Sequence, residues 1–126
     1  MIVLVALGGA IGAMARYAVD LLLGARWSAR RGRGRRGVAL AVINITGSLL
    51  IGLVAGLALR GLVSDELRTV LATGVLGGYT TFSAASLDVV EQAEREGRAA
   101  ALRRAIAVPA AAVIACAVGL WLSSPR

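Results

Sequence analysis

Polar side chains that could do chemistry lie inside long apolar stretches of this chain. Asn44 and Ser48 are four residues apart in a stretch without any charge, so one face of a helix would carry both. An amide among apolar neighbours must find a hydrogen-bond partner. Asn44 therefore either bonds to a neighbouring helix or donates into a polar path, and the spacing leaves both interpretations open.

A second polar group follows a run of glycines. Gly74, Gly77 and Gly78 weaken a helix. Hydroxyl side chains come directly after them, at Thr80, Thr81, Ser83 and Ser86. Carbonyl groups freed by a break in a helix can coordinate a cation, and the helix N-terminus beyond the break favours an anion. The spacing of Gly74 and Gly78 fits close helix packing equally well, so this segment also has two interpretations.

A charge lies within the first apolar stretch, at Arg16. A charge in such a position usually faces the interior of a bundle or water and marks a function. Asp20 lies one helical turn further on, so an ion pair between the two is an alternative, and extension of the long side chain to the membrane surface is another. Enzyme catalysis is not expected, because the chain has no histidine, no paired catalytic carboxylates and no phosphate-binding loop.

Four apolar runs must position these side chains. Hydrophobic residues make up 58% of the 126 residues and charged residues 17%, whereas soluble domains carry about 25% charged residues. Each run is near the ~20 residues that a helix needs to cross the hydrocarbon core. We therefore expect an all-α membrane protein with one domain, residues 1–126, whose third helix is either closely packed and intact or broken near its middle. The expected transmembrane helices cover residues 2–23, 38–59, 67–87 and 105–122.

The positive charge is distributed unevenly along the chain. All 14 basic residues are arginines, and ten of them lie in the first and third connections, residues 25–37 and 88–104. By the positive-inside rule these connections are cytoplasmic, so both termini of an inner-membrane protein would lie outside. Segment 25–37 is then a topology signal that contacts anionic lipid headgroups. A nucleic-acid site is not expected, because Trp27 is the one aromatic residue of this segment.

Three stretches together resemble the CrcB/Fluc family of small fluoride channels. They are residues 8–17 (GGAIGAMARY), 44–52 (NITGSLLIG) and 74–83 (GVLGGYTTFS). The third stretch is the most specific of the three. The stretches fall in order on the first three expected helices, and the four-helix plan covers nearly the whole chain.

The resemblance implies an assembly and a bound ion. Two antiparallel subunits would form a dimer with two fluoride paths along their interface. A Na⁺ ion would lie at the centre of the dimer, held by backbone carbonyls at a break in the third helix, and these carbonyls match Gly77 and Thr80. The family's arginine in the first helix matches Arg16, either near the pore mouth or holding local structure.

The resemblance also implies which side chains line each fluoride path. The family's pore asparagine matches Asn44, and the first of its two pore phenylalanines matches Phe82, whose positive ring edge could face an anion. The hydroxyl track would include Ser83, with Thr81 as a further member.

Two departures from the family pattern bear on assembly. The family continues after Ser83 with Thr-Phe, where this chain has Ala84 and Ala85, and residues 106–109 (IAVP) lack the family's serine. A homodimer would therefore lack two pore-lining groups in each path. The strong arginine bias also favours one orientation in the membrane, which opposes an antiparallel homodimer. We expect either a homodimer or, in view of this bias, a heterodimer with a homologous subunit inserted the other way round.

The resemblance implies passive export of cytoplasmic fluoride down its electrochemical gradient. Two other functions stay open. One is an accessory membrane subunit without a pore of its own, which the missing pore groups leave open. A small proton-coupled multidrug exporter would need a membrane-embedded carboxylate, for which Asp20 is the candidate.

Overall fold

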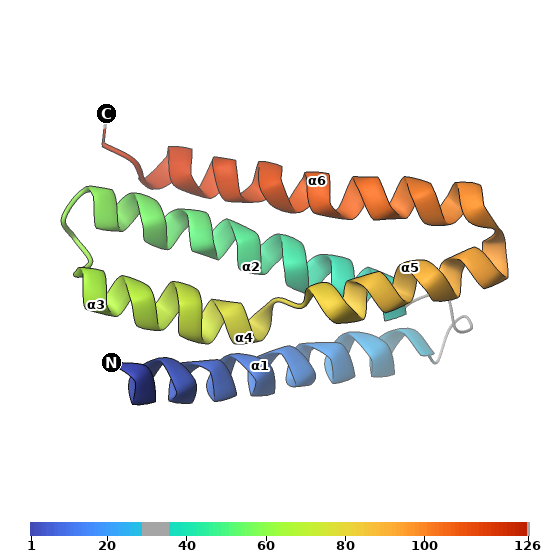
Figure 1. The fold of residues 1–126 in the computed structure, drawn as a ribbon, viewed down its shortest axis with the longest axis horizontal. Helices are drawn as coiled ribbons and strands as arrows, with labels where there is room; N and C mark the ends of the chain where they lie inside the picture. The colour runs from blue at the N-terminus through green and yellow to red at the C-terminus, as the bar shows by residue number, and fades with distance from the viewer. Residues whose placement is uncertain (29–35, 126) are drawn as a thin grey trace.

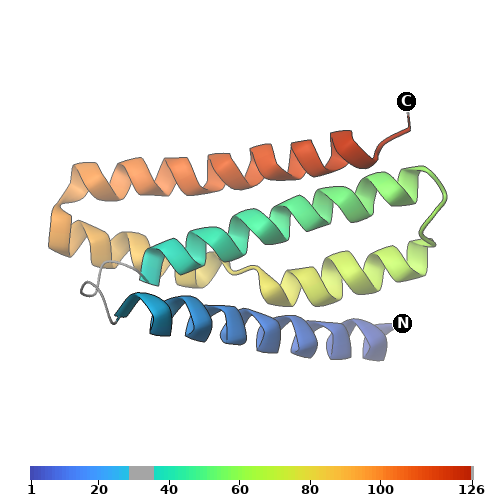
Figure 2. The same ribbon diagram turned by 180° about the vertical axis from the view of Figure 1, so that it is seen from behind.

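The chain folds into four helical units that run side by side along one axis (Figures 1 and 2). The computed structural model describes residues 1–28 and 36–125. These residues are helical apart from short connections, which confirms the all-α class. The elements are α1 (Ile2–Ser28), α2 (Arg36–Leu59), α3 (Asp65–Arg68), the π-helical η1 (Thr69–Leu76), α4 (Gly77–Tyr79), α5 (Phe82–Glu96) and α6 (Arg98–Ser123).

The third unit consists of α3, η1, α4 and α5, which follow one another end to end with a bend between α4 and α5 (Figure 1). Ser64 caps its start, because the Ser64 hydroxyl accepts a hydrogen bond from the backbone N–H of Leu67 at 3.2 Å. Thr80 and Thr81 have extended backbones, with ψ angles of 155° and 119°, and the helix begins again at Phe82. The predicted break in the third helix is therefore present, at residues 80–81.

All four units are long and apolar enough to cross a membrane, over Ile2–Leu23, Gly37–Leu59, Asp65–Glu96 and Arg98–Ser123. Many of their large apolar side chains are exposed on the isolated chain; Ile2 is 85% exposed and Val113 is 69% exposed. A soluble monomer rarely leaves so much apolar surface in contact with water. The chain is a multi-pass membrane protein, and lipid or a second subunit covers these faces.

One end of the bundle, where α5 turns into α6, differs from the expectation; we call it the Gly97 end. The sequence predicts a connection over residues 88–104, whereas α5 extends to Glu96 and α6 begins at Arg98. Gly97 alone separates them, with a φ of 90° that a residue with a Cβ rarely adopts. α5 continues beyond the end of the third apolar run, at residue 87, because its second half is polar and can remain helical in water. Residues 29–35 of the basic segment 25–37 lie outside the described residues.

Glycines bring the backbones of α1 and the third unit into contact. A Cβ atom at Gly12 would overlap the carbonyl oxygen of Val75, and a Cβ atom at Gly78 would overlap the carbonyl oxygen of Gly9. Gly74 is also buried against α1, where its Cβ position lies 2.9 Å from the carbonyl oxygen of Val5. The third unit therefore contains both features that the sequence left as alternatives, close helix packing and a break.

The most extensive contact between two elements joins α2 to α6. A Cβ atom at Gly52 would overlap the carbonyl oxygen of Cys116, and a Cβ atom at Gly119 would overlap that of Leu49. The buried Ser123 donates from its hydroxyl to the carbonyl oxygen of Gly119 at 2.7 Å. This contact holds α6 at a fixed distance from the polar face of α2.

Candidate functional site

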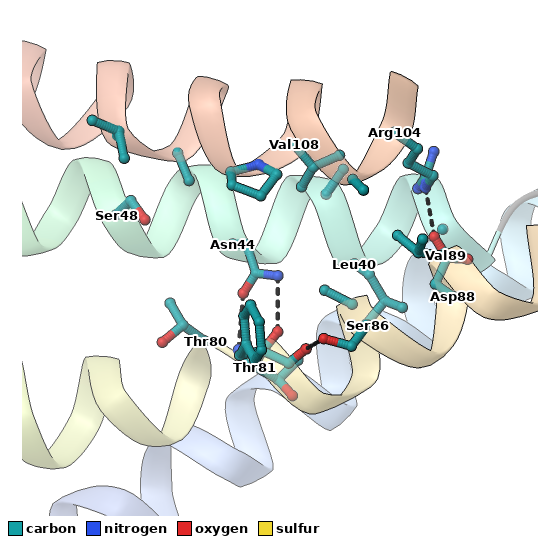
Figure 3. Close-up of a pocket in the computed structure, with 18 residues that line it drawn as sticks. Leu40, Asn44, Ser48, Thr80, Thr81, Ser86, Asp88, Val89, Arg104 and Val108 are labelled. Atoms are coloured by element: carbon teal, nitrogen blue, oxygen red, sulfur yellow. Dashed lines mark hydrogen bonds and ion pairs between the residues drawn. The ribbon is translucent and has the colours of Figure 1, made fainter. Parts of the chain in front are cut away.

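The side-chain amide of Asn44 is bonded to the break in the third unit (Figure 3). Its Oδ1 atom accepts a hydrogen bond from the backbone N–H of Thr81 at 2.8 Å, and its Nδ2 atom donates to the carbonyl oxygen of Thr81 at 3.0 Å. Thr81 is buried, so these backbone groups would otherwise lack partners. The amide carries a second N–H, and that N–H has no other acceptor among the residues that the structure describes.

The hydroxyl groups at the break bond locally. Thr80 donates from Oγ1 to the carbonyl oxygen of Leu76 at 3.0 Å. Thr81 caps α5, because its Oγ1 atom accepts the backbone N–H of Ala84 at 3.3 Å. The same oxygen lies 3.4 Å from the hydroxyl of Ser83. The break is therefore a capped, hydrogen-bonded junction between two half-helices and not a loose segment.

The carbonyl oxygens of Gly77 and Thr80 leave the helical hydrogen-bond ladder at this junction. The N–H of Thr81 would reach Gly77 in an unbroken helix, but it bonds to Asn44. Among the described residues, no donor is recorded for either carbonyl oxygen. Free backbone carbonyls at a helix break are ligands that suit Na⁺, so the chemistry of these two groups fits the predicted ion.

The position of the break corrects one step of the sequence interpretation. Gly74, Gly77 and Gly78 remain helical, in η1 and α4, and the extended residues are Thr80 and Thr81. Gly74 and Gly78 allow close contact with α1, whereas the helix opens where Asn44 can replace the lost backbone partners. The local weakness of glycine therefore does not set the exact site of the break.

A cavity of about 470 Å³ extends from the break toward the Gly97 end, between α2, α5 and α6 (Figure 3). Asn44 faces it from α2. The hydroxyl-bearing residues that line the cavity are Ser48, Thr80, Thr81 and Ser86. The α6 wall is apolar over most of its length, at Ala105, Val108, Pro109, Ala112 and Val113.

The predicted path residues are only partly brought together by this cavity. Asn44, Thr81 and Phe82 line it, whereas Ser83 does not. Phe82 is 84% exposed on the isolated chain, which is unusual for a large aromatic side chain at membrane depth. Ala85 lines the cavity where the family has its second phenylalanine, so this chain has open space there.

An ion pair lies at the end of the cavity nearest Gly97. Arg104 of α6 donates from Nε to Oδ2 of Asp88 on α5 at 2.5 Å (Figure 3). A Cβ atom at Gly37, in the first turn of α2, would overlap both side chains. The sequence pattern does not point to these three residues. Asp88 and Arg104 are sixteen residues apart and lie on two different helices, so they do not share a helical face.

Arg16 lies at a second, smaller cavity of about 200 Å³ between α1, α2 and α5. Asp20, Asp88 and Glu91 also line this cavity. Within the described residues, Arg16 has no carboxylate within ion-pair distance, so the alternative pair with Asp20 is not formed in this chain. Arg16 therefore contributes a cation beside three acidic side chains without a direct contact.

Comparison with known proteins shows which family the chain belongs to. Residues 3–122 match the family model described as CrcB-like protein, Camphor Resistance (CrcB). The chain belongs to the CrcB-like family. The match covers all four helical units, including the Asn44–Thr81 junction and the cavity beside it.

Curated relatives of this CrcB-like chain carry a consistent name. The Fluoride-specific ion channel FluC of Chelativorans sp. (strain BNC1) is 45% identical over 97% of this chain and 94% of its own length. Fluoride-specific ion channel FluC 1 of Leifsonia xyli subsp. xyli is 38% identical over 97% of this chain and 85% of its own. Fluoride-specific ion channel FluC of Agrobacterium fabrum is 48% identical over 75% of this chain and 72% of its own.

Proposed function

We propose that this chain is a subunit of a fluoride channel that exports cytoplasmic fluoride passively. The observation that carries the proposal is the nearly full-length similarity to relatives named as fluoride-specific ion channels. The Asn44–Thr81 junction supports it, because it keeps the polar break intact at membrane depth. An inside-negative potential drives an anion outward with about 2.3 kcal/mol per charge per 100 mV.

The cavity between α2, α5 and α6 supports a path for a partly dehydrated anion. The second N–H of Asn44 and the hydroxyl groups near it can replace lost water. The exposed ring of Phe82 can offer its positive edge to the same anion. Ser83, which lies outside the cavity of one subunit, belongs to the path where a second subunit covers α5.

We also propose that the subunits pair in an antiparallel dimer around a Na⁺ ion. The carbonyls of Gly77 and Thr80 supply two ligands from one chain, and a second chain would supply the same number. The arginine bias orients this chain with both termini outside, which supports a partner that is inserted the other way round. Such a partner would also bring the phenylalanine and serine that this chain lacks.

Fluoride efflux from proteoliposomes tests the proposed function. This chain is reconstituted alone and, in parallel, with a homologous chain of opposite arginine bias. We expect electrically driven fluoride efflux from the mixed preparation and little from this chain alone. Robust efflux from this chain alone would contradict the need for a heterodimer. No fluoride efflux from either preparation would overturn the proposed channel function and support an accessory role.

The family assignment argues against the alternative of a proton-coupled multidrug exporter. Asp20 lies at the smaller cavity with Arg16, Asp88 and Glu91, away from the Asn44–Thr81 junction. Proton-coupled exchange needs a carboxylate in the transport path. Among the described residues, Asp88 is the one carboxylate that lines the larger cavity, and it forms an ion pair with Arg104.

A further inference from the structure

The ion pair between Asp88 and Arg104 lies at the end of the larger cavity nearest Gly97, and we call this end the mouth. Both side chains line the cavity, and both are mostly buried, with 16% and 21% of their side-chain surface exposed. The pair joins α5 to α6 and packs on Gly37 at the start of α2. All three elements that form the cavity therefore meet at these two charges.

Arg104 is also the one polar side chain that α6 contributes to the cavity. α6 is described over its whole length, and its other lining residues are alanines, valines and Pro109. An anion that moves along this wall meets no hydroxyl group on α6. Any attraction from α6 must therefore come from Arg104, at the mouth.

Asp88 by itself would oppose an anion at this position. Like charges at contact distance repel strongly where the effective dielectric constant is low. Arg104 offsets this repulsion, because its guanidinium lies in direct contact with the carboxylate. The net charge of the pair is therefore zero; without Arg104 the remaining charge is negative, and without Asp88 it is positive.

We propose that Arg104 is a specificity-determining residue of the path, which admits anions at the Gly97 end by neutralising Asp88. This inference rests on the proposed channel function. It assigns to the pair an electrostatic role in permeation, beyond the joining of α5 to α6. The two roles make opposite predictions for a variant that lacks both charges.

The test measures fluoride efflux from proteoliposomes that contain Arg104→Gln, Asp88→Asn or both substitutions, in the preparation in which the unmodified chain conducts. With Arg104→Gln, an unpaired carboxylate stays at the mouth, and we expect efflux to fall about tenfold, which corresponds to roughly 1.4 kcal/mol of barrier. Asp88→Asn leaves the cation, and we expect efflux at or above the unmodified level. The double variant should recover most of the flux lost in Arg104→Gln.

A purely structural ion pair predicts the reverse pattern, because Asp88→Asn and the double variant would both lose the contact and neither would restore flux. Arg103→Gln is the matched control, since Arg103 is the exposed neighbour on α6 and does not line the cavity. Equal efflux from Arg104→Gln and Arg103→Gln would overturn this inference but not the proposed channel function. A double variant as slow as Arg104→Gln would overturn it as well.

Two further outcomes separate the inference from protein folding and from the proposed function. If Arg104→Gln yields no folded protein in gel filtration, Asp88→Asn decides, and a loss of flux in that variant contradicts the proposal. If the unmodified chain conducts neither alone nor with a homologous subunit, the proposed function fails, and the inference that rests on it fails too.

Discussion

Asn44 stabilises a helix break by imitating the backbone that the break has lost. Its amide offers one acceptor and one donor to the N–H and carbonyl of Thr81, at 2.8 and 3.0 Å. A buried backbone group that loses its partner costs about 1–3 kcal/mol. The residue is therefore structural and, through its second N–H, available to an anion at the same time.

Asn44→Ala should destabilise the protein by about 1–3 kcal/mol for each orphaned group of Thr81 and should reduce fluoride efflux. The measurement is the thermal unfolding midpoint in detergent, followed by efflux from liposomes. Ser48→Ala is the matched control, because Ser48 lines the same cavity from α2 but its hydroxyl group has no hydrogen bond to a described residue. Equal midpoints for the two variants would show that the bonds to Thr81 are not important for stability.

At the scale of elements, glycines determine how closely α1 approaches the third unit. Gly9 and Gly12 both lie on α1, but the space around them differs. A Cβ atom at Gly12 would overlap the carbonyl oxygen of Val75, whereas the nearest atom to a Cβ at Gly9 is the carbonyl oxygen of Gly74, at 3.8 Å.

Gly12→Ala should therefore separate α1 from η1 and destabilise the protein by about 1–3 kcal/mol, the usual cost of overpacking. Gly9→Ala adds the same methyl group without overlap, and we expect a neutral or slightly stabilising effect from its better helix propensity. Thermal unfolding of the two variants in detergent checks this. A lower midpoint for Gly9→Ala than for Gly12→Ala would contradict the packing that we describe.

The sequence predicts the elements well and their exact interruptions less well. Apolar runs of nearly 20 residues are sufficient to locate four helices, since a membrane leaves few alternatives. The break is different, because Thr80 and Thr81 open only where Asn44, 37 residues away, can replace the backbone partners. The Asp88–Arg104 pair is equally non-local, since the turn at Gly97 brings the two residues together.

At the scale of the whole molecule, one chain leaves its polar junction incomplete. The carbonyl oxygens of Gly77 and Thr80 lack donors among the described residues, and Phe82 beside them is exposed. A Na⁺ ion shared by two subunits would satisfy these carbonyls on both sides. Removal of Na⁺ should therefore weaken the dimer more than it weakens the fold of each subunit.

The measurement is the dimer fraction in detergent after exchange of Na⁺ for a large organic cation, followed by gel filtration with light scattering. We expect dissociation while the helical circular dichroism signal stays unchanged. Asn44→Ala, which disturbs the same junction, should increase the dependence on Na⁺. A dimer fraction that does not change with Na⁺ would contradict the shared ion.

The arginines predict the orientation of the whole chain, and this orientation bears on the kind of partner that we propose. Ten of the fourteen arginines lie in the segments 25–37 and 88–104, so we expect a single orientation with Ser124 outside. A cysteine at position 124, in a Cys116→Ala background, should then react fully with an impermeant maleimide on intact cells. Replacing Arg30, Arg31, Arg33, Arg35 and Arg36 with glutamine should lower labelling toward about half, as the chain inserts both ways. Half-labelling of the unmodified chain would instead mean that it supplies both orientations itself and needs no second kind of subunit.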